Sequence, residues 1–192
     1  MRIIAGTLGG RRLKTVEGEG MRPAMGRTRE ALFSMLASRG IDWQYASALD
    51  LFAGSGSLAF EAVSRGARHA LLVENANAAV RCLRENIRFL GIEARTRVVK
   101  DDALRFLGQL PDQRQTALFN LVFIDPPYGK NLTEPVLRRL VNNNWLAARA
   151  FVTAEIEKDA AFATPDALVP LADRLFGQTR VCVWRMEDRA SG

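Results

Sequence analysis

An alternation of short apolar runs with amphipathic stretches, which begins at Ala48 and continues to residue 156, is the feature that most constrains the fold of this chain. Each apolar run has the length of a strand, and each intervening stretch repeats its apolar residues at helical spacing. Such an alternation predicts parallel βαβ units and therefore a doubly wound α/β sheet. The expected strands are 48–52, 70–73, 97–99, 118–124 and 151–156, and the expected helices are 57–64, 76–90, 103–107 and 133–141.

The two ends of the chain depart from this alternation. Residues 168–186 hold two further β-rich runs around Gly177, which predict an antiparallel hairpin at the edge of the sheet. Near the start, β-type stretches within 2–16 flank the turn-forming pair Gly9 and Gly10, and they predict a small basic hairpin. The sheet would then be mostly parallel, with an antiparallel C-terminal edge.

A loop and a helix are expected between the N-terminal hairpin and the first strand. The glycine-rich residues 17–26 predict the loop, and Thr28 can cap a helix that stops near Gly40. The first forty residues therefore resemble an appendage to the alternating part. We expect an N-terminal extension over 1–40 and one main domain over 41–192.

Charge and metal-binding residue types narrow the class of partner. The net charge of +6 favours a polyanion such as nucleic acid. Cys82 and Cys182 lie far apart without a CxxC pair, and His69 is the single histidine, so we expect no metal site. Neither a signal peptide nor a long apolar run occurs in the sequence. We therefore expect a cytoplasmic monomer that contacts no membrane.

A glycine-rich turn over 50–57 lies between the first expected strand and the first expected helix of the alternation. In a doubly wound sheet, ligands bind beyond the carboxyl ends of the strands, where glycine lets the backbone approach them closely. Gly54, Gly56 and Ala59 also fit the fingerprint of dinucleotide-binding proteins, so a nicotinamide or flavin protein stays open at this point. The expected cofactor-binding residues of this turn are Asp50, Phe52, Ala53, Gly54, Ser55 and Gly56.

Acidic residues follow the next two expected strands on the same rim. Glu74 ends the second strand, where its carboxylate can accept hydrogen bonds from ribose hydroxyls. Asp101 and Asp102 follow the third strand and could accept from an adenine amino group. We expect Glu74, Asn75, Asp102 and Ala103 to contact a nucleotide-like cofactor.

The fourth apolar run ends in Asp125, Pro126, Pro127 and Tyr128, again at the carboxyl end of a strand. Two successive prolines fix the backbone into a rigid corner without N–H donors. A carboxylate before this corner and an aromatic ring after it form a pocket for a flat group with a polar edge. We call residues 125–128 the Asp-Pro-Pro-Tyr corner and expect all four to be catalytic, with Asp125 also facing the cofactor.

An amine on a conjugated ring is the acceptor that suits such a corner. Its lone pair is delocalised, so the nitrogen is a poor nucleophile until its hydrogens are held. The Asp125 carboxylate and the Pro126 carbonyl could accept both N–H groups and aim the lone pair at a sulfonium methyl, while Tyr128 stacks on the ring. A sulfonium leaves as a neutral thioether, so this hypothesis needs no general acid.

Taken together, the glycine turn, Glu74, Asp102 and the Asp-Pro-Pro-Tyr corner resemble the amino-group class of Rossmann-like methyltransferases. The whole chain is similar to the RsmD type, through its Arg-Ile-Ile-Ala-Gly start, the Gly10–Leu13 turn and the helix after Arg29. This resemblance implies S-adenosyl-L-methionine as cofactor and the N2 amine of a guanine in small-subunit (16S) ribosomal RNA as acceptor.

The same resemblance, together with the excess of basic residues before Ala31, implies an RNA-contacting surface at the N-terminus. The family pattern usually has Arg-Pro-Thr where this chain has Arg22, Pro23 and Ala24, and an aliphatic residue where this chain has Thr28. The expected RNA-binding residues are Arg11, Arg12, Lys14, Arg22 and Arg29. The RNA could be free or part of an assembled or assembling particle.

Three alternatives stay open on the sequence. Adenine N6 DNA methyltransferases and glutamine N5 protein methyltransferases share the Pro-Pro-Tyr corner, although sequence-specific DNA enzymes normally carry an additional domain. A non-catalytic nucleotide-binding or RNA-binding module with the same core is the third. Asp125 argues against that module, because binding alone does not need a carboxylate directed at a methyl donor.

Overall fold

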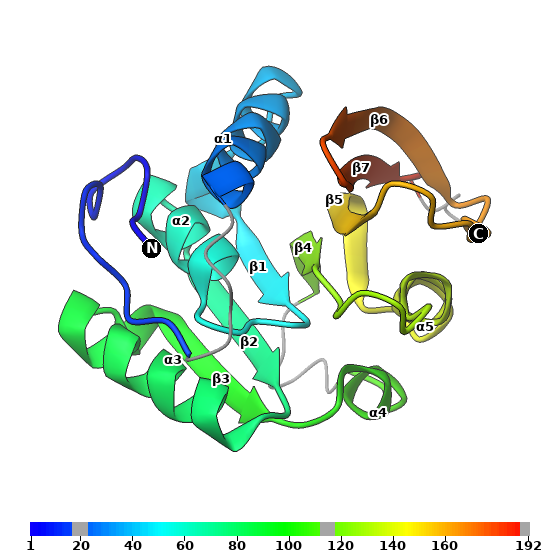
Figure 1. Ribbon diagram of the computed structural model, residues 1–192. Helices are drawn as coiled ribbons and strands as arrows, with labels where there is room; N and C mark the ends of the chain where they lie inside the picture. The colour runs from blue at the N-terminus through cyan, green and yellow to red at the C-terminus, as the bar shows by residue number, and fades with distance from the viewer. Residues whose placement is uncertain (17–22, 112–117, 189–192) are drawn as a thin grey trace.

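The computed structural model describes residues 1–16, 23–111 and 118–188, with residues 23–25 described by their backbone alone. Its centre is a seven-stranded sheet in the order β3-β2-β1-β4-β5-β7-β6 (Figure 1). Strands β1 to β5 pair in parallel, and β7 pairs antiparallel with both β5 and β6. The strands are β1 Ser47–Asp50, β2 His69–Glu74, β3 Thr96–Lys100, β4 Phe119–Ile124, β5 Leu146–Glu157, β6 Leu168–Phe176 and β7 Thr179–Met186.

This topology confirms the predicted α/β class and the antiparallel edge. The chain turns at Gly177, whose φ of 63° lies in the left-handed region that favours glycine. Strand β7 lies between β5 and the edge strand β6, so the C-terminal hairpin adds two strands to the parallel part. Because β1, β2, β4 and β5 run parallel, their carboxyl ends meet at one rim of the sheet.

Helices cover both faces of the sheet, as Figure 1 shows. On one face α1, α2 and α3 bury Leu32, Phe33, Leu36, Phe60 and Leu83 against the strands. On the other face α4 and α5 bury Phe106, Leu107, Val136, Leu137 and Leu140 beside Trp145. The helices are α1 Pro23–Ser38, α2 Ser57–Arg65, α3 Asn77–Leu90, α4 Ala103–Leu107 and α5 Thr133–Asn142, with short 3-10 turns at Trp43–Tyr45 and Glu93–Arg95.

The start of α1 corrects the prediction made from Thr28. The helix begins at Pro23, and proline suits the first helical position because the N–H it lacks would have no helical partner there. Thr28 lies inside the helix and is buried, so it is no cap. The expected loop over 17–26 is therefore wrong for 23–26, and its part over 17–22 lies outside the described residues.

The N-terminal hairpin is present in reduced form, as one antiparallel bridge between Arg2 and Arg12. It packs on the helices of the main body, because the Thr7 amide donates to the Ser64 carbonyl oxygen at 2.8 Å and the Lys14 amide to Asn86 Oδ1 at 2.9 Å. Its Ile3 and Leu13 also belong to the core under α1 to α3. The division of the chain near residue 40 stays a prediction.

Candidate active site

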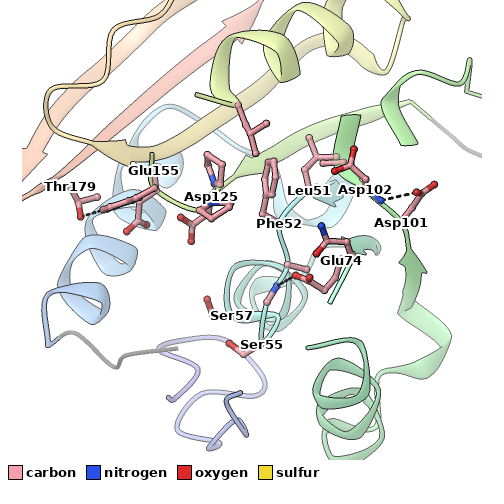
Figure 2. A pocket seen from close by; sticks show the side chains of 18 of the residues that line it. Leu51, Phe52, Ser55, Ser57, Glu74, Asp101, Asp102, Asp125, Glu155 and Thr179 are labelled. Atoms are coloured by element: carbon pink, nitrogen blue, oxygen red, sulfur yellow. Dashed lines mark hydrogen bonds between the residues drawn. The ribbon is translucent and has the colours of Figure 1, made fainter. Parts of the chain in front are cut away.

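A pocket of about 580 Å³ opens at the carboxyl ends of the parallel strands, with contributions from β5 and from the first residue of β7 (Figure 2). Twelve of the fourteen cofactor-binding and catalytic residues expected from the sequence line it. These are Phe52, Ala53, Gly54, Ser55, Glu74, Asn75, Asp102, Ala103, Asp125, Pro126, Pro127 and Tyr128. The structure thus brings the glycine turn and the Asp-Pro-Pro-Tyr corner to one cavity.

The two exceptions, Asp50 and Gly56, are not among the residues that line the pocket. Gly56 has a φ of 87°, and a Cβ added there would lie 2.2 Å from the Phe60 ring. Asp50 is buried, and its Oδ2 accepts from the Ala59 amide at 3.2 Å. Burial raises the pKa of Asp50 to about 7. Both residues hold the turn against α2, and direct contact with a cofactor stays a prediction for them.

The acids after β2 and β3 are held by the backbone around them. Glu74 accepts through Oε2 from the Gly54 amide at 2.9 Å and through Oε1 from the Ala76 amide at 2.8 Å. Asp102 caps α4 by accepting from the Arg105 amide at 3.0 Å. These contacts fix the position of two carboxylates on the pocket wall. Hydroxyl or amino donors of a nucleoside would meet acceptors there.

The Asp-Pro-Pro-Tyr corner forms another wall of the same pocket, after the end of β4. Asp125 follows the last residue of β4, and Figure 2 shows its carboxylate directed into the pocket. The hydroxyl of Tyr128 lies 2.9 Å from Thr179 Oγ1 on β7, and 38% of the tyrosine surface is exposed. The ring is therefore held at its tip while solvent still reaches it, as a stacking surface requires.

Two residues of this wall, Glu155 and Thr179, were not predicted from the sequence. Glu155 is a half-buried acid on β5 that lines the pocket. Burial raises its pKa to about 7, against an opposing effect of Arg29. An acid within the otherwise apolar run 151–156 was a signal that could have identified it. Thr179 carried no such local signal, because it reaches the pocket only through the pairing of β7 with β5.

The expected RNA-binding residues divide into three groups. Arg11 and Arg12 are exposed on the N-terminal hairpin, and Lys14 is exposed there too, with its Nζ 2.9 Å from Glu85 Oε2. Arg22 lies outside the described residues. Arg29 is buried on α1 and donates through Nη2 to the Arg2 carbonyl oxygen at 2.5 Å. A surface contact between Arg29 and RNA is therefore wrong, because its guanidinium is inside the fold.

Over 1–16, 23–111 and 118–188, no group of three or more histidine, cysteine, aspartate or glutamate side chains is placed to hold a metal ion. In the same parts of the chain, none of the helices combines the length and the apolar character needed to span a membrane.

Comparison with known proteins agrees with this geometry. Ribosomal RNA small subunit methyltransferase D of Haemophilus influenzae is 36% identical over 178 residues, which make up 92% of this chain and 89% of the relative. A solved structure of the Escherichia coli protein yhhF, named as a candidate methyltransferase, superposes with a TM-score of 0.85 and 34% identity, over 98% of this chain and 99% of that one.

A more distant solved structure shares the fold alone. It is an RNA methyltransferase from Salinibacter ruber in complex with S-adenosyl-L-homocysteine, with a TM-score of 0.55 and 17% identity over 84% of this chain and 93% of that one. The family model described as conserved hypothetical protein 95 matches residues 1–185. With nearly the whole chain matched, this protein belongs to the conserved hypothetical protein 95 family, within the Rossmann-like methyltransferase fold.

Proposed function

We propose that this protein transfers the methyl group of S-adenosyl-L-methionine to the exocyclic N2 amine of a guanine in small-subunit ribosomal RNA. The observation that carries the proposal is that the glycine turn and the Asp-Pro-Pro-Tyr corner line one pocket. The name of the Haemophilus influenzae relative supports the substrate, and the ligand of the Salinibacter ruber enzyme supports the cofactor class.

The cofactor half of the pocket consists of the residues that follow β1, β2 and β3. Its acceptors fit a nucleoside, since Glu74 and Asp102 are held in place and face the donors that a ribose and an adenine present. When bound, S-adenosyl-L-methionine supplies an electrophilic methyl on a sulfonium. The residues of this half that are proposed to hold it are Phe52, Ala53, Gly54, Ser55, Glu74, Asn75, Asp102 and Ala103, and Asp125 of the acceptor half would face its methyl group.

The acceptor half consists of the Asp-Pro-Pro-Tyr corner with Glu155 and Thr179. Here Asp125 and the Pro126 carbonyl oxygen accept the two N–H groups of the amine and thereby turn its lone pair toward the cofactor half. Tyr128, held by Thr179, stacks on the base and fixes its plane. Alignment of this kind lowers a barrier by roughly 7 to 11 kcal/mol. The sulfonium leaves as a neutral thioether, and the surplus proton of the methylated amine passes to Asp125 or to water, so no separate acid–base pair is required. The base must be flipped out of its helix to reach the pocket.

The exposed basic residues of the N-terminal hairpin are proposed to contact the RNA backbone. Arg11 and Arg12 project from a hairpin that packs on α3, where Arg84 and Arg88 are also exposed. Clustered arginines attract phosphates without reading sequence. We propose that a monomer acts in the cytoplasm on the small subunit as an assembled or assembling particle, whose folded RNA presents the target base by shape.

The test is transfer of labelled methyl groups to small ribosomal subunits from cells that lack this activity. We expect the label in the RNA of the particle, as N2-methylguanosine after digestion to nucleosides. Matched reactions would contain double-stranded DNA or a protein release factor. Strong labelling of either of these, with none in the ribosomal RNA, would overturn the proposed substrate.

A further inference from the structure

Glu155 lies beside Asp125 at the rim of the sheet. Strands β4 and β5 pair in parallel with Ile124 opposite Ala154. Asp125, directly after β4, and Glu155, near the end of β5, therefore occupy neighbouring positions at the rim. Figure 2 shows both carboxylates directed into the same pocket. The acceptor half therefore presents two carboxylates, although the transfer step proposed above uses only Asp125.

The surroundings of Glu155 leave its carboxylate available to a ligand. The cation nearest to it in charge is Arg29, whose Nη2 donates to the Arg2 carbonyl oxygen instead. Within the described parts of the chain, Glu155 takes part in no hydrogen bond and no ion pair within 4.0 Å. A half-buried carboxylate without a hydrogen-bond partner is stabilised most by donors that a ligand brings.

The base proposed as substrate carries such a donor next to the reacting amine. Guanine presents an N1–H beside its N2 amino group, whereas adenine has an unprotonated acceptor at N1. With both N2 hydrogens directed to Asp125 and Pro126, a neighbouring carboxylate is suited to the remaining N1–H. An ionised carboxylate cannot donate to an unprotonated N1, so above about pH 8, where Glu155 with its pKa of about 7 has lost its proton, it would reject bases without that hydrogen. The rates below are compared at that pH.

We infer that Glu155 is a specificity residue that accepts the N1–H of the target guanine and so selects guanine over bases that lack this hydrogen. The inference rests on the proposed function, because it requires a guanine N2 acceptor in the pocket. The charge of Glu155 is favoured by Arg29, and burial opposes it.

The test compares guanine with 2-aminopurine, a base that keeps the N2 amine but has no hydrogen on N1. The modified position is first mapped with wild-type protein. Small subunits are then reconstituted with RNA that carries either base at that position. We expect wild-type kcat/KM to favour guanine by at least about tenfold, the minimum for losing a hydrogen bond to a charged acceptor. An equal rate on the two bases would overturn the inference without any variant.

The variant Glu155→Gln separates base reading from support of the fold. Its amide can donate to an unprotonated N1, so we expect the preference for guanine to fall to within about threefold, largely through faster reaction of the 2-aminopurine particle. 2-Aminopurine also lacks the O6 of guanine. This difference between the bases affects wild type and Glu155→Gln alike, so it cancels when their preferences for guanine are compared. Glu187→Gln, at an exposed glutamate just after β7, is the matched control and keeps the wild-type preference.

The outcomes distinguish this inference from the proposed function. If Glu155 only supports the fold, Glu155→Gln should lower the rates on both bases together and leave their ratio unchanged. That result would overturn the inference and leave the proposed guanine methylation standing. If wild-type protein methylates no guanine at N2 in the mapping step, the proposed function fails first. Affinity for S-adenosyl-L-methionine, measured by calorimetry, verifies that each variant keeps its cofactor half.

Discussion

The two halves of the pocket differ in how their polar groups are held. In the cofactor half, Glu74 accepts from two backbone amides and Asp102 caps α4, so the wall is shaped by hydrogen bonds of the protein itself. In the acceptor half, Tyr128 is partly exposed and Glu155 faces the pocket without a comparable backbone contact among the described residues. One half is organised before any ligand arrives, and the other depends on the base to complete its contacts.

Asp125→Ala should produce the largest effect, and it should separate the rate of methyl transfer from cofactor affinity most clearly. Removing the carboxylate leaves the amine hydrogens unheld, and we expect kcat to fall about 10³-fold, the loss typical of a preorganised electrostatic contact. Affinity for S-adenosyl-L-methionine should change by less than about threefold, since the rest of the cofactor half is intact. Labelled transfer and calorimetry measure the two quantities.

The exposed Asp166 in the connection from β5 to β6 provides the control for this experiment. Asp166→Ala should match wild type in both measurements. A near wild-type rate in Asp125→Ala would remove the proposed mechanism, and a parallel loss of cofactor affinity would show that the halves are not separable at Asp125.

Tyr128→Ala should come next, with kcat/KM for small subunits reduced about 10²-fold because stacking of a base on an aromatic ring is lost. Tyr128→Phe keeps the ring and loses only the hydroxyl contact with Thr179, so we expect a decrease of about fivefold. Steady-state rates against particle concentration give both values. Equal losses in the two variants would assign the role to the hydroxyl rather than to stacking.

Asp50 tests the cofactor half through its pH dependence. Burial raises its folded-state pKa to about 7 from an ordinary value of 3.8, so the folded protein keeps a proton that the unfolded chain releases. The contribution of Asp50 to the free energy of unfolding is therefore largest below about pH 4 and is lost as the pH rises toward 7. Between pH 5 and pH 7 we expect wild type to lose about 2 kcal/mol more than Asp50→Asn.

Urea unfolding of both proteins at the two pH values measures this difference. Glu155, whose pKa is raised in the same direction, is present in both and cancels. An identical pH dependence in wild type and Asp50→Asn would mean that Asp50 stays ionised in the fold. An ionised Asp50 would need a cation near its carboxylate, and the contacts of the described residues place none there.

The halves also differ in how well the sequence predicted them. The cofactor half depends on local motifs, since the turn after β1, the acid ending β2 and the cap of α4 each lie within a few residues of their strand. Helix 103–107 and the pocket positions of Glu74 and Asp102 were predicted for this reason. The inner role of Asp50 and Gly56 was missed, because burial behind the turn follows from packing on α2.

The acceptor half depends on residues brought together from distant parts of the chain. Asp125 and Tyr128 form a local motif and were predicted, whereas Thr179 and Glu155 reach the pocket through the register of β7 and β5. Arg29 was misplaced on the surface because a charged side chain is mostly exposed unless a tertiary partner compensates it. Contacts of this kind carry no spacing signal in the sequence.

Glu74→Gln should have the opposite effect to Asp125→Ala, because it should weaken cofactor binding and spare methyl transfer. Its effect should also be smaller. One oxygen of the carboxylate becomes an amide nitrogen, so at most one of the Gly54 and Ala76 contacts survives. We expect affinity for S-adenosyl-L-methionine to fall about tenfold, with kcat at saturating cofactor within about twofold. Glu93→Gln, at an exposed residue near the opposite end of the sheet, is the control. A loss confined to kcat would contradict a cofactor role for Glu74.

Arg11→Ala and Arg12→Ala should give the smallest effects, because both residues lie outside either half of the pocket. Each should weaken binding to small subunits by about threefold and lower the slope of log affinity against log salt concentration by about one, as expected for a lost phosphate contact. Arg174→Ala, at an exposed arginine on β6, should change neither quantity. Filter binding over a series of salt concentrations measures the slopes. If Arg174→Ala lowers the slope as much as Arg11→Ala does, the RNA is attracted by overall charge, and the hairpin has no particular place in the interface.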